Sequence, residues 1–278
     1  MIQIITDSCA DLSPALKERY HIHTVPLSVF LGEQTYLDGE EIGLTELFAG
    51  VKQHNQLPKT SAVPQGRFEA AFQALDGELL VLTISSQLSA TYQSAVLASQ
   101  SFPERTIHVI DTLNLSTGIG LLALRAAELR DAGKSLDEIV QDITQTAPKI
   151  RTAFIIDTLE YLYMGGRCSA MQNVMSSLLQ IRPVIECRPD GTLGIQSKVR
   201  GTRKKALASL VESFRKNLEK MDLHRVFITH TGCDEDAQAV AAEMASLAPI
   251  QEICITYTGA TVACHCGPNT LGIIYLEK

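Results

Sequence analysis

The chain has 278 residues, of which 24 are Lys or Arg and 31 are Asp or Glu, so its formal charge at pH 7 is −7. With 45% hydrophobic and 20% charged residues, the composition excludes collagen-like, low-complexity and globally disordered chains, and the length suffices for two ordinary domains. The acidic balance argues against wholesale nucleic-acid binding, although it leaves room for a local basic cluster near Arg200.

No segment has the features of a membrane span or of a secretory leader. The longest apolar run, 118–124, falls well short of the ~20 residues that a spanning helix needs. The first apolar residues lead directly into the polar Thr6-Asp7-Ser8, without a basic start or a cleavage site. The cysteines are odd in number and scattered: Cys9, Cys168, Cys187, Cys233, Cys254, Cys264 and Cys266. We therefore expect a cytoplasmic protein with free thiols.

In the first half, short apolar runs alternate with stretches of helical periodicity, as in βαβ units. Strands are predicted over 2–6, 25–30, 79–84 and 107–110. Each is mostly apolar, which is typical of parallel strands covered on both faces. A helix is predicted over 117–130, ending at Gly133, and a second one begins with the capping box Ser135-x-x-Glu138 and ends before Pro148.

The second half repeats the alternation after Pro148. Strands are predicted over 152–156, 195–199, 225–229, 252–256 and 272–276, and helices over 203–220 and 234–247. The expected fold class is α/β, with two α/β domains at 1–150 and 151–278, the first built on a mainly parallel sheet. The sequence contains no internal repeat with a fixed period. Because no long Pro- or Ser-rich linker separates the two halves, they should pack directly.

Two hydroxyl-rich segments are candidates for binding an anion. Ser89 lies in a turn between the strand over 79–84 and the start of a helix, where unpaired N–H groups favour negative charge. The alternative is that Ser89 only caps that helix, a common role for serine. Thr60 and Ser61 form a similar pair in a polar loop, ahead of a helix predicted from about Gly66.

Asp7 and Asp111 each end an apolar strand, where open α/β sheets place their ligands. A pair of carboxylates there could chelate Mg²⁺ for phosphoryl transfer. Alternatively, each could cap the segment that follows it.

Cys264, His265 and Cys266 lie in a segment over 258–272 whose glycines and proline predict a shaped loop before the last strand. Zinc is not expected, since adjacent ligands cannot form the separated pairs of a structural site and no Cys-x-x-Cys occurs. A Cys–His catalytic dyad is also disfavoured, because consecutive side chains of an extended loop point apart. His265 is left as a candidate hydrogen-bond donor.

Six of the 24 basic residues gather in two nearby motifs: Arg167, Lys198, Arg200, Arg203, Lys204 and Lys205. Cations at a helix N-terminus oppose the helix dipole, so a negatively charged partner or ligand would offset their cost. Nucleotide-binding and hydrolase functions lack their usual support, since Gly-x-x-x-x-Gly-Lys-[Ser/Thr], Gly-x-Ser-x-Gly and Gly-x-Gly-x-x-Gly are all absent.

Six blocks in chain order resemble the signature segments of the DegV family. They are TDSCADL (6–12), KTSAVP (59–64), SSQLSATYQSA (85–95), EYLYMGGR (160–167), KVRGTRKKAL (198–207) and HCGPNTLG (265–272). Each block is weak alone, but together they span nearly the whole chain.

The resemblance implies a two-domain protein that binds one long-chain fatty acid in a tunnel between its domains and presents it to a fatty acid kinase. It implies no catalytic residue, cofactor, metal or nucleic-acid partner, and it is compatible with transient exchange of lipid at a membrane. The fatty acid carboxylate would be held by Thr60 or Ser61, Ser89 and His265. The kinase would dock at Arg167 and Arg200, with Arg203 in the same basic cluster.

The chain departs from the usual DegV pattern in three places. Ala90 replaces a glycine at the closest backbone approach to the headgroup, Met164 replaces a lysine of the docking cluster, and Asn269-Thr270 replaces a Gly-Ala pair. Two other functions stay open at this stage. One is a Mg²⁺-dependent phosphoryl-transfer enzyme using Asp7 and Asp111, and the other is a regulatory α/β protein without a ligand.

Overall fold

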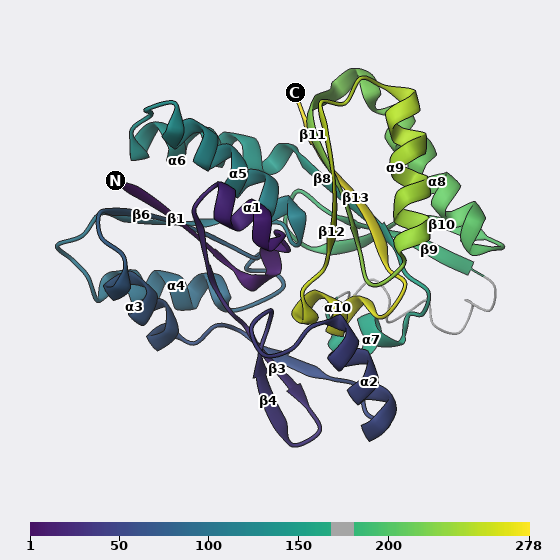
Figure 1. The fold of residues 1–278 in the computed structure, drawn as a ribbon, viewed down its shortest axis with the longest axis horizontal. Helices are drawn as coiled ribbons and strands as arrows, with labels where there is room; N and C mark the ends of the chain where they lie inside the picture. The colour runs from purple at the N-terminus through teal and green to yellow at the C-terminus, as the bar shows by residue number, and fades with distance from the viewer. Residues whose placement is uncertain (168–180) are drawn as a thin grey trace.

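The N-terminal half of the molecule is built on a parallel sheet (Figure 1). The structure is a computed structural model that describes residues 1–167 and 181–278. Its first sheet contains β1 (Ile2–Asp7), β2 (Ile22–Val25), β6 (Glu78–Thr83) and β7 (Ile107–Asp111) in the order β2-β1-β6-β7, with every pair parallel. The central strands β1 and β6 are buried along nearly their whole length, which explains their continuous apolar sequence.

Helices cover both faces of this sheet (Figure 1). The helices α3 (Gln65–Ala74) and α4 (Thr91–Gln100) lie on one face, and α5 (Thr117–Asp131) and α6 (Leu136–Thr146) lie on the other. The capping box predicted at the start of α6 is formed by Ser135 and Glu138. The short η1 (Ser8–Ala10) and α1 (Pro14–Arg19) connect β1 to β2.

The C-terminal half is built on a mixed sheet of six strands. These are β8 (Ile150–Ile155), β9 (Ile181–Cys187), β10 (Leu193–Arg200), β11 (Met221–His230), β12 (Glu252–Tyr257) and β13 (Leu271–Glu277), in the order β10-β9-β8-β13-β11-β12. Only the β11–β12 pair is parallel. The helices α8 (Arg203–Lys216) and α9 (Asp234–Leu247) pack on this sheet, as does α5 of the N-terminal half. The predicted α/β fold class is confirmed.

The strand predicted over 25–30 was wrong in part, because the second half of this segment belongs to a third, small sheet. That segment forms β2 and then β3 (Ser28–Leu31), which belong to different sheets. Pro26 separates them, because proline has no N–H for a sheet and its carbonyl here accepts a hydrogen bond from Arg67. The strands β4 (Gln34–Leu37) and β5 (Lys59–Ser61) flank β3, and α2 (Leu44–His54) packs beside them.

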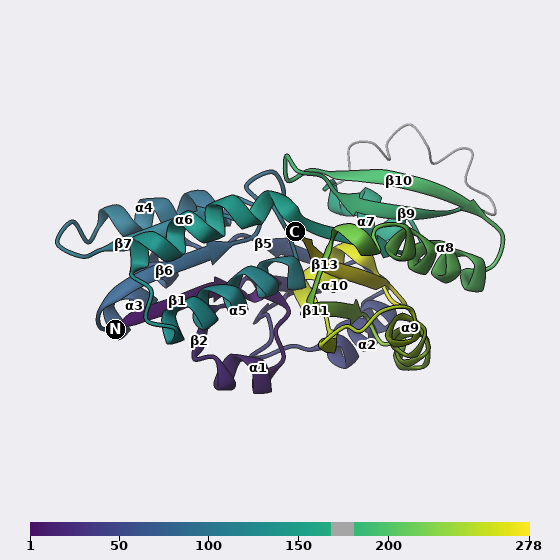
Figure 2. The ribbon, with the colours of Figure 1, turned by 90° about the horizontal axis from the view of Figure 1, so that it is seen from above.

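The prediction of a shaped loop over 258–272 was also wrong in part, because this segment contains the helix α10 (Ala260–Cys266). This helix contacts α2, β3, β5, η1 and α7 (Glu160–Gly165), and it lies where the two halves meet (Figure 2). Its Ala260, Ala263 and Cys264 join an apolar cluster with side chains of β3 and α2. The C-terminal end of the chain therefore completes the packing of the N-terminal half.

The remaining described elements are the short η2 (Ala147–Lys149) and η5 (Leu218–Lys220). The change from the first sheet to the second falls at Ile150, where β8 begins, although the domain ranges 1–150 and 151–278 stay a prediction. Across the described part of the chain, no helix is long and apolar enough to cross a membrane. Six cysteines there are free thiols, and Cys168 lies outside the described residues.

Candidate ligand-binding site

A cavity of about 40 Å³ lies between the two halves, with apolar walls and a polar end. The apolar lining consists of Cys9, Leu27, Ala62, Ile84, Leu88, Leu115, Leu162, Leu193, Val262 and Cys266. The polar side chains are those of Thr60, Ser61, Ser89, Arg167, Thr261 and His265. Four of the five ligand-binding residues predicted from the sequence thus meet in one cavity, although they are far apart along the chain.

Thr60 and His265 are in direct contact. Thr60 lies on β5, where it pairs with Val29 of β3, and His265 lies in the last turn of α10. The Thr60 hydroxyl and the His265 Nε2 are 2.8 Å apart, across 205 positions of sequence. This hydrogen bond joins the small third sheet to α10 at the polar end of the cavity.

His265 is a neutral imidazole at neutral pH. Burial lowers its pKa to about 4, and the positive charge of Arg167 acts in the same direction. Its Nδ1 is buried and has no hydrogen-bond partner among the residues that the structure describes. A side chain at Gly165 would overlap the imidazole at this nitrogen, so glycine at this position of α7 lets the backbone pack against the ring. This role of Gly165 was not predicted from the sequence.

Ser89 is half-buried and belongs to a short chain of hydroxyl contacts. Its Oγ lies 2.9 Å from the Thr91 Oγ1 and accepts a hydrogen bond from the Thr91 N–H at 3.3 Å. Thr91 in turn accepts from the N–H of Val63, which follows the Thr60–Ser61 segment. Ser89 therefore contacts the start of α4, whose N-cap is Ala90, and also lines the cavity, while its binding of an anion stays a prediction. The linking role of Thr91 was not predicted.

Ala90, the fifth predicted ligand-binding residue, is the exposed N-cap of α4 and does not line the cavity. Its role at the headgroup stays a prediction.

Arg167 lies nearer the cavity than its predicted docking role suggested. Its Nη1 donates to the Gly165 carbonyl at 2.6 Å and its Nε donates to the Leu88 carbonyl at 3.3 Å. These bonds hold the guanidinium at the polar end of the cavity, close enough to influence the pKa of His265. Arg200, by contrast, is exposed at the end of β10 and does not line the cavity.

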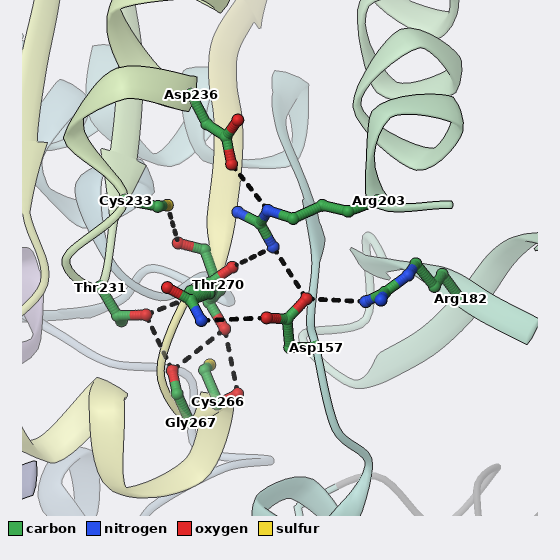
Figure 3. A network of polar contacts seen from close by, with 10 residues as sticks. Asp157, Arg182, Arg203, Thr231, Cys233, Asp236, Cys266, Gly267 and Thr270 are labelled. Atoms are coloured by element: carbon green, nitrogen blue, oxygen red, sulfur yellow. Dashed lines mark hydrogen bonds and ion pairs between the residues drawn. The ribbon is translucent and has the colours of Figure 1, made fainter. Parts of the chain in front are cut away.

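Arg203, at the start of α8, is engaged within the protein (Figure 3). Its guanidinium is 2.6 Å from Asp236, 3.0 Å from Asp157 and 2.6 Å from the carbonyl of Asn269. Arg182 pairs with the same Asp157 at 2.7 Å. Asp157 and Asp236 therefore supply the negative charge that offsets the Arg203 cation at the start of α8.

The same network fixes the turn between α10 and β13 (Figure 3). The Thr231 hydroxyl donates to the carbonyl of Gly267 at 2.8 Å and accepts from the N–H of Thr270 at 2.7 Å. The Thr270 hydroxyl donates to the carbonyl of Cys266 at 3.0 Å. The C-terminal end of the helix that carries His265 is thus held by neighbouring backbone and hydroxyl groups.

Asp7 and Asp111 both serve the backbone. Asp7 accepts hydrogen bonds from the N–H groups of Cys9 and Ile84 at 2.9 and 2.7 Å, and burial raises its pKa to about 7. Asp111 accepts from the N–H groups of Ser86 and Leu113 at 3.1 and 3.0 Å. Among the described residues, no group of three or more His, Cys, Asp or Glu side chains is placed to hold a metal ion.

The Cys264-His265-Cys266 run lies on a helix rather than in the extended loop that was expected. Its side chains therefore spread around the helix: Cys264 faces the apolar cluster of the third sheet, whereas His265 and Cys266 line the cavity. Burial raises the pKa of both thiols, that of Cys266 to about 12, so they stay protonated at neutral pH.

An apolar cavity with a few hydroxyls and an imidazole, placed between two α/β halves, has the form that small-molecule sites usually take. A family model described as "Uncharacterised protein, DegV family" matches residues 1–278, and the chain belongs to this family.

The chain is similar over its whole length to curated and solved members of the family. A DegV domain-containing protein of Deinococcus radiodurans is 38% identical, with 98% of this chain and 97% of that protein covered. A solved structure on fatty acid binding of a DegV family protein from Thermus thermophilus is 33% identical, with a TM-score of 0.93 over 100% of this chain and 99% of that one. The structure of DegV, a fatty acid binding protein from Bacillus subtilis, is 29% identical, with a TM-score of 0.89 and coverage of 100% and 99%.

Proposed function

We propose that this protein binds one long-chain fatty acid in the cavity between its halves and presents the carboxylate to a fatty acid kinase, without itself being an enzyme. One observation carries the proposal: Thr60, Ser61, Ser89 and His265 converge at the polar end of an otherwise apolar cavity. Two similar solved structures of the family are described as fatty acid binding, which supports the same ligand class.

The headgroup would be held mainly by neutral donors. With the imidazole proton on Nε2, His265 donates to Thr60, and the Thr60 hydroxyl proton is then free to point at a ligand oxygen. Ser89 and Ser61 offer further hydroxyls, and Arg167 supplies a positive charge at the same end. Neutral donors satisfy a buried carboxylate without locking it in a tight ion pair, which suits a group that must react with a phosphoryl donor.

The tail would provide most of the affinity. Burying about 14 methylenes at ~0.8 kcal/mol each yields roughly 11 kcal/mol before the costs of ordering and association. The cavity of about 40 Å³ is too small for such a chain, so its walls would have to move apart when lipid is taken up. Both halves line the cavity, and a change in their spacing would open it.

Extraction of the purified protein tests the proposal directly. We expect organic solvent to release about one fatty acid per chain, identified by mass spectrometry, because an apolar cavity is poorly hydrated when empty. Fresh protein that contains no lipid and takes none up would refute the carrier function. Tightly bound stoichiometric Mg²⁺ with phosphoryl-transfer activity would instead support the enzyme built on Asp7 and Asp111.

Removing headgroup donors should weaken retention of the carboxylate. Ser89→Ala and His265→Ala are each expected to cost about 1 to 3 kcal/mol of binding free energy, since the first removes a hydroxyl donor to the carboxylate and the second removes the donor that orients the Thr60 hydroxyl toward it. Ser99→Ala is a matched control, because its hydroxyl bonds only to the carbonyl of Val96 on the same helix α4. Fatty acid affinities measured by calorimetry should separate the two groups, and unchanged affinity in both headgroup variants would contradict the placement.

Charge reversal should separate lipid binding from kinase docking. Arg200→Glu is expected to leave the fatty acid bound but to slow its phosphorylation by the cognate kinase, as raised salt would, because exposed charges act mainly on association. Arg167→Glu should also weaken lipid retention, since Arg167 lines the cavity. Arg203 is a poorer probe of docking, because its replacement would break the network around Asp157. Normal phosphorylation of the Arg200→Glu complex would exclude this surface.

A further inference from the structure

The start of α10 is held by two carboxylates from the opposite end of the chain. The N–H of Gly259, the N-cap residue, donates to the Asp11 Oδ1 at 2.7 Å, and the N–H of Ala260 donates to the Asp38 Oδ1 at 2.7 Å. Gly259 has no side chain with which to cap its own helix, and α10 has only seven residues. Asp11 and Asp38 therefore supply, from more than 220 positions away, the acceptors that this short helix lacks.

The two carboxylates are themselves fixed. The second oxygen of Asp11 accepts from the Ser116 hydroxyl at 2.5 Å, and that of Asp38 accepts from the Ser8 hydroxyl at 2.8 Å. Both side chains are buried, and Asp11 reaches its position from a left-handed backbone conformation with φ of 50°. Asp and Asn tolerate that conformation better than most residues. These contacts tie the acceptors rigidly to the N-terminal half.

Asp11 and Asp38 are connected to the cavity through α10, which carries His265. His265 follows Ala260 by five positions, which is about 7.5 Å along the axis of one short rigid helix. We propose that Asp11 and Asp38 are positioning residues for the headgroup site: they hold the start of α10 so that the His265 imidazole lies within hydrogen-bond distance of Thr60. This inference rests on the proposed function. Neither residue lines the cavity, so each would act on the ligand through α10.

The test compares two probes that share a tail and differ in headgroup, palmitic acid and hexadecan-1-ol. The parent protein should prefer the acid. In Asp38→Ala, this preference should fall about five- to tenfold, whereas Asp38→Asn should keep most of it, because the amide oxygen still accepts from Ala260. In a His265→Ala background, Asp38→Ala should change the preference no further, since the residue through which it acts is already gone.

Two further variants, one milder substitution and one control, keep the experiment interpretable if Asp38→Ala folds poorly. Ser116→Ala removes only the hydroxyl that orients Asp11, and it should lower the acid preference about two- to fivefold. Asp142→Ala is the control: it truncates an aspartate bonded to Arg125 on α5, away from α10, and should lower stability without changing the preference.

Two results would overturn the positioning role. Asp38→Ala could weaken both probes by the same factor, or its effect could add to that of His265→Ala. A parent protein that binds both probes equally would instead refute the headgroup site of the proposed function.

Discussion

An alanine at position 165 is expected to displace His265 and to weaken fatty acid binding by more than tenfold. The added methyl group would overlap the imidazole Nδ1, and α10 cannot move away with the ring because the helix is held at both ends. Loss of the hydrogen bond to Thr60 should then compound the loss of packing. Affinity for the fatty acid and a structure of the variant would measure both effects.

Gly66→Ala is the matched control for this substitution. Gly66 also lies in a helix, but a side chain there would meet no atom within 4 Å. Because alanine favours a helix over glycine by roughly 1 kcal/mol, this variant should be slightly more stable than the parent and should bind normally. If Gly165→Ala bound fatty acid as tightly as Gly66→Ala, the packing of α7 on His265 would be irrelevant to the ligand.

The contribution of Asp7 to the stability of the protein is expected to fall as the pH rises from about 4 to about 7, whereas the contribution of His265, whose pKa burial lowers to about 4, rises over the same range. Burial raises the pKa of Asp7 from its ordinary value of 3.8 to about 7, so between these values the folded state binds a proton that the unfolded chain releases. Asp7 alone should lower the free energy of unfolding by about 4 kcal/mol across this range. Burial raises the pKa of Asp11 and Asp38 in the same direction. Urea unfolding at several pH values would measure the trend.

Asp7→Asn isolates the contribution of this carboxyl. The amide of this variant keeps one acceptor but turns its NH₂ toward a backbone N–H. At pH 4 the variant should therefore be less stable than the parent by about 1 to 3 kcal/mol. The gap should close as the pH rises and reverse in sign near pH 7, where the parent begins to carry the buried charge. Asp142→Asn should instead show a nearly constant stability difference from the parent between pH 4 and 7, because the hydrogen bond from Arg125 lowers the pKa of Asp142 below its ordinary value and keeps this carboxylate charged across the range. Parallel stability curves for the parent and Asp7→Asn would contradict the assignment.

Elements with a local pattern could be predicted from the sequence. The helix predicted over 234–247 coincides with α9, and the apolar runs over 2–6 and 79–84 lie within one residue of β1 and β6. β9 was missed because it contains Arg182, Pro183 and Glu186 in place of a continuous apolar run. Prediction of α10 failed because its N-terminal acceptors, Asp11 and Asp38, lie far away in the sequence and its own cap residue is glycine.

The polar end of the cavity was predictable for a different reason. Ser89 and the Thr60–Ser61 pair precede helices, where hydroxyls and free N–H groups are expected to accumulate. His265 was left as a candidate donor once zinc and a catalytic dyad were disfavoured, and the family resemblance grouped these residues around one carboxylate. The contributions of Gly165 and Thr91 depend on contacts between segments: Gly165 packs against a ring from α10, and Thr91 accepts from Val63. No local pattern distinguishes these two from an ordinary helix glycine or threonine.

The helix α10 is synthesised after the segments of the N-terminal half that it packs against. The cavity lining extends from Cys9 to Cys266, and the contact between Thr60 and His265 closes a loop of 205 residues. A nascent chain can therefore form its parallel sheet while the apolar side chains of the future cavity are still uncovered, and contacts this distant in sequence are slow to form. Chains stopped before Ala260 should keep much of the N-terminal sheet, yet they should aggregate and depend on chaperones. Under the proposed function, fatty acid could be bound only after α10 has been synthesised.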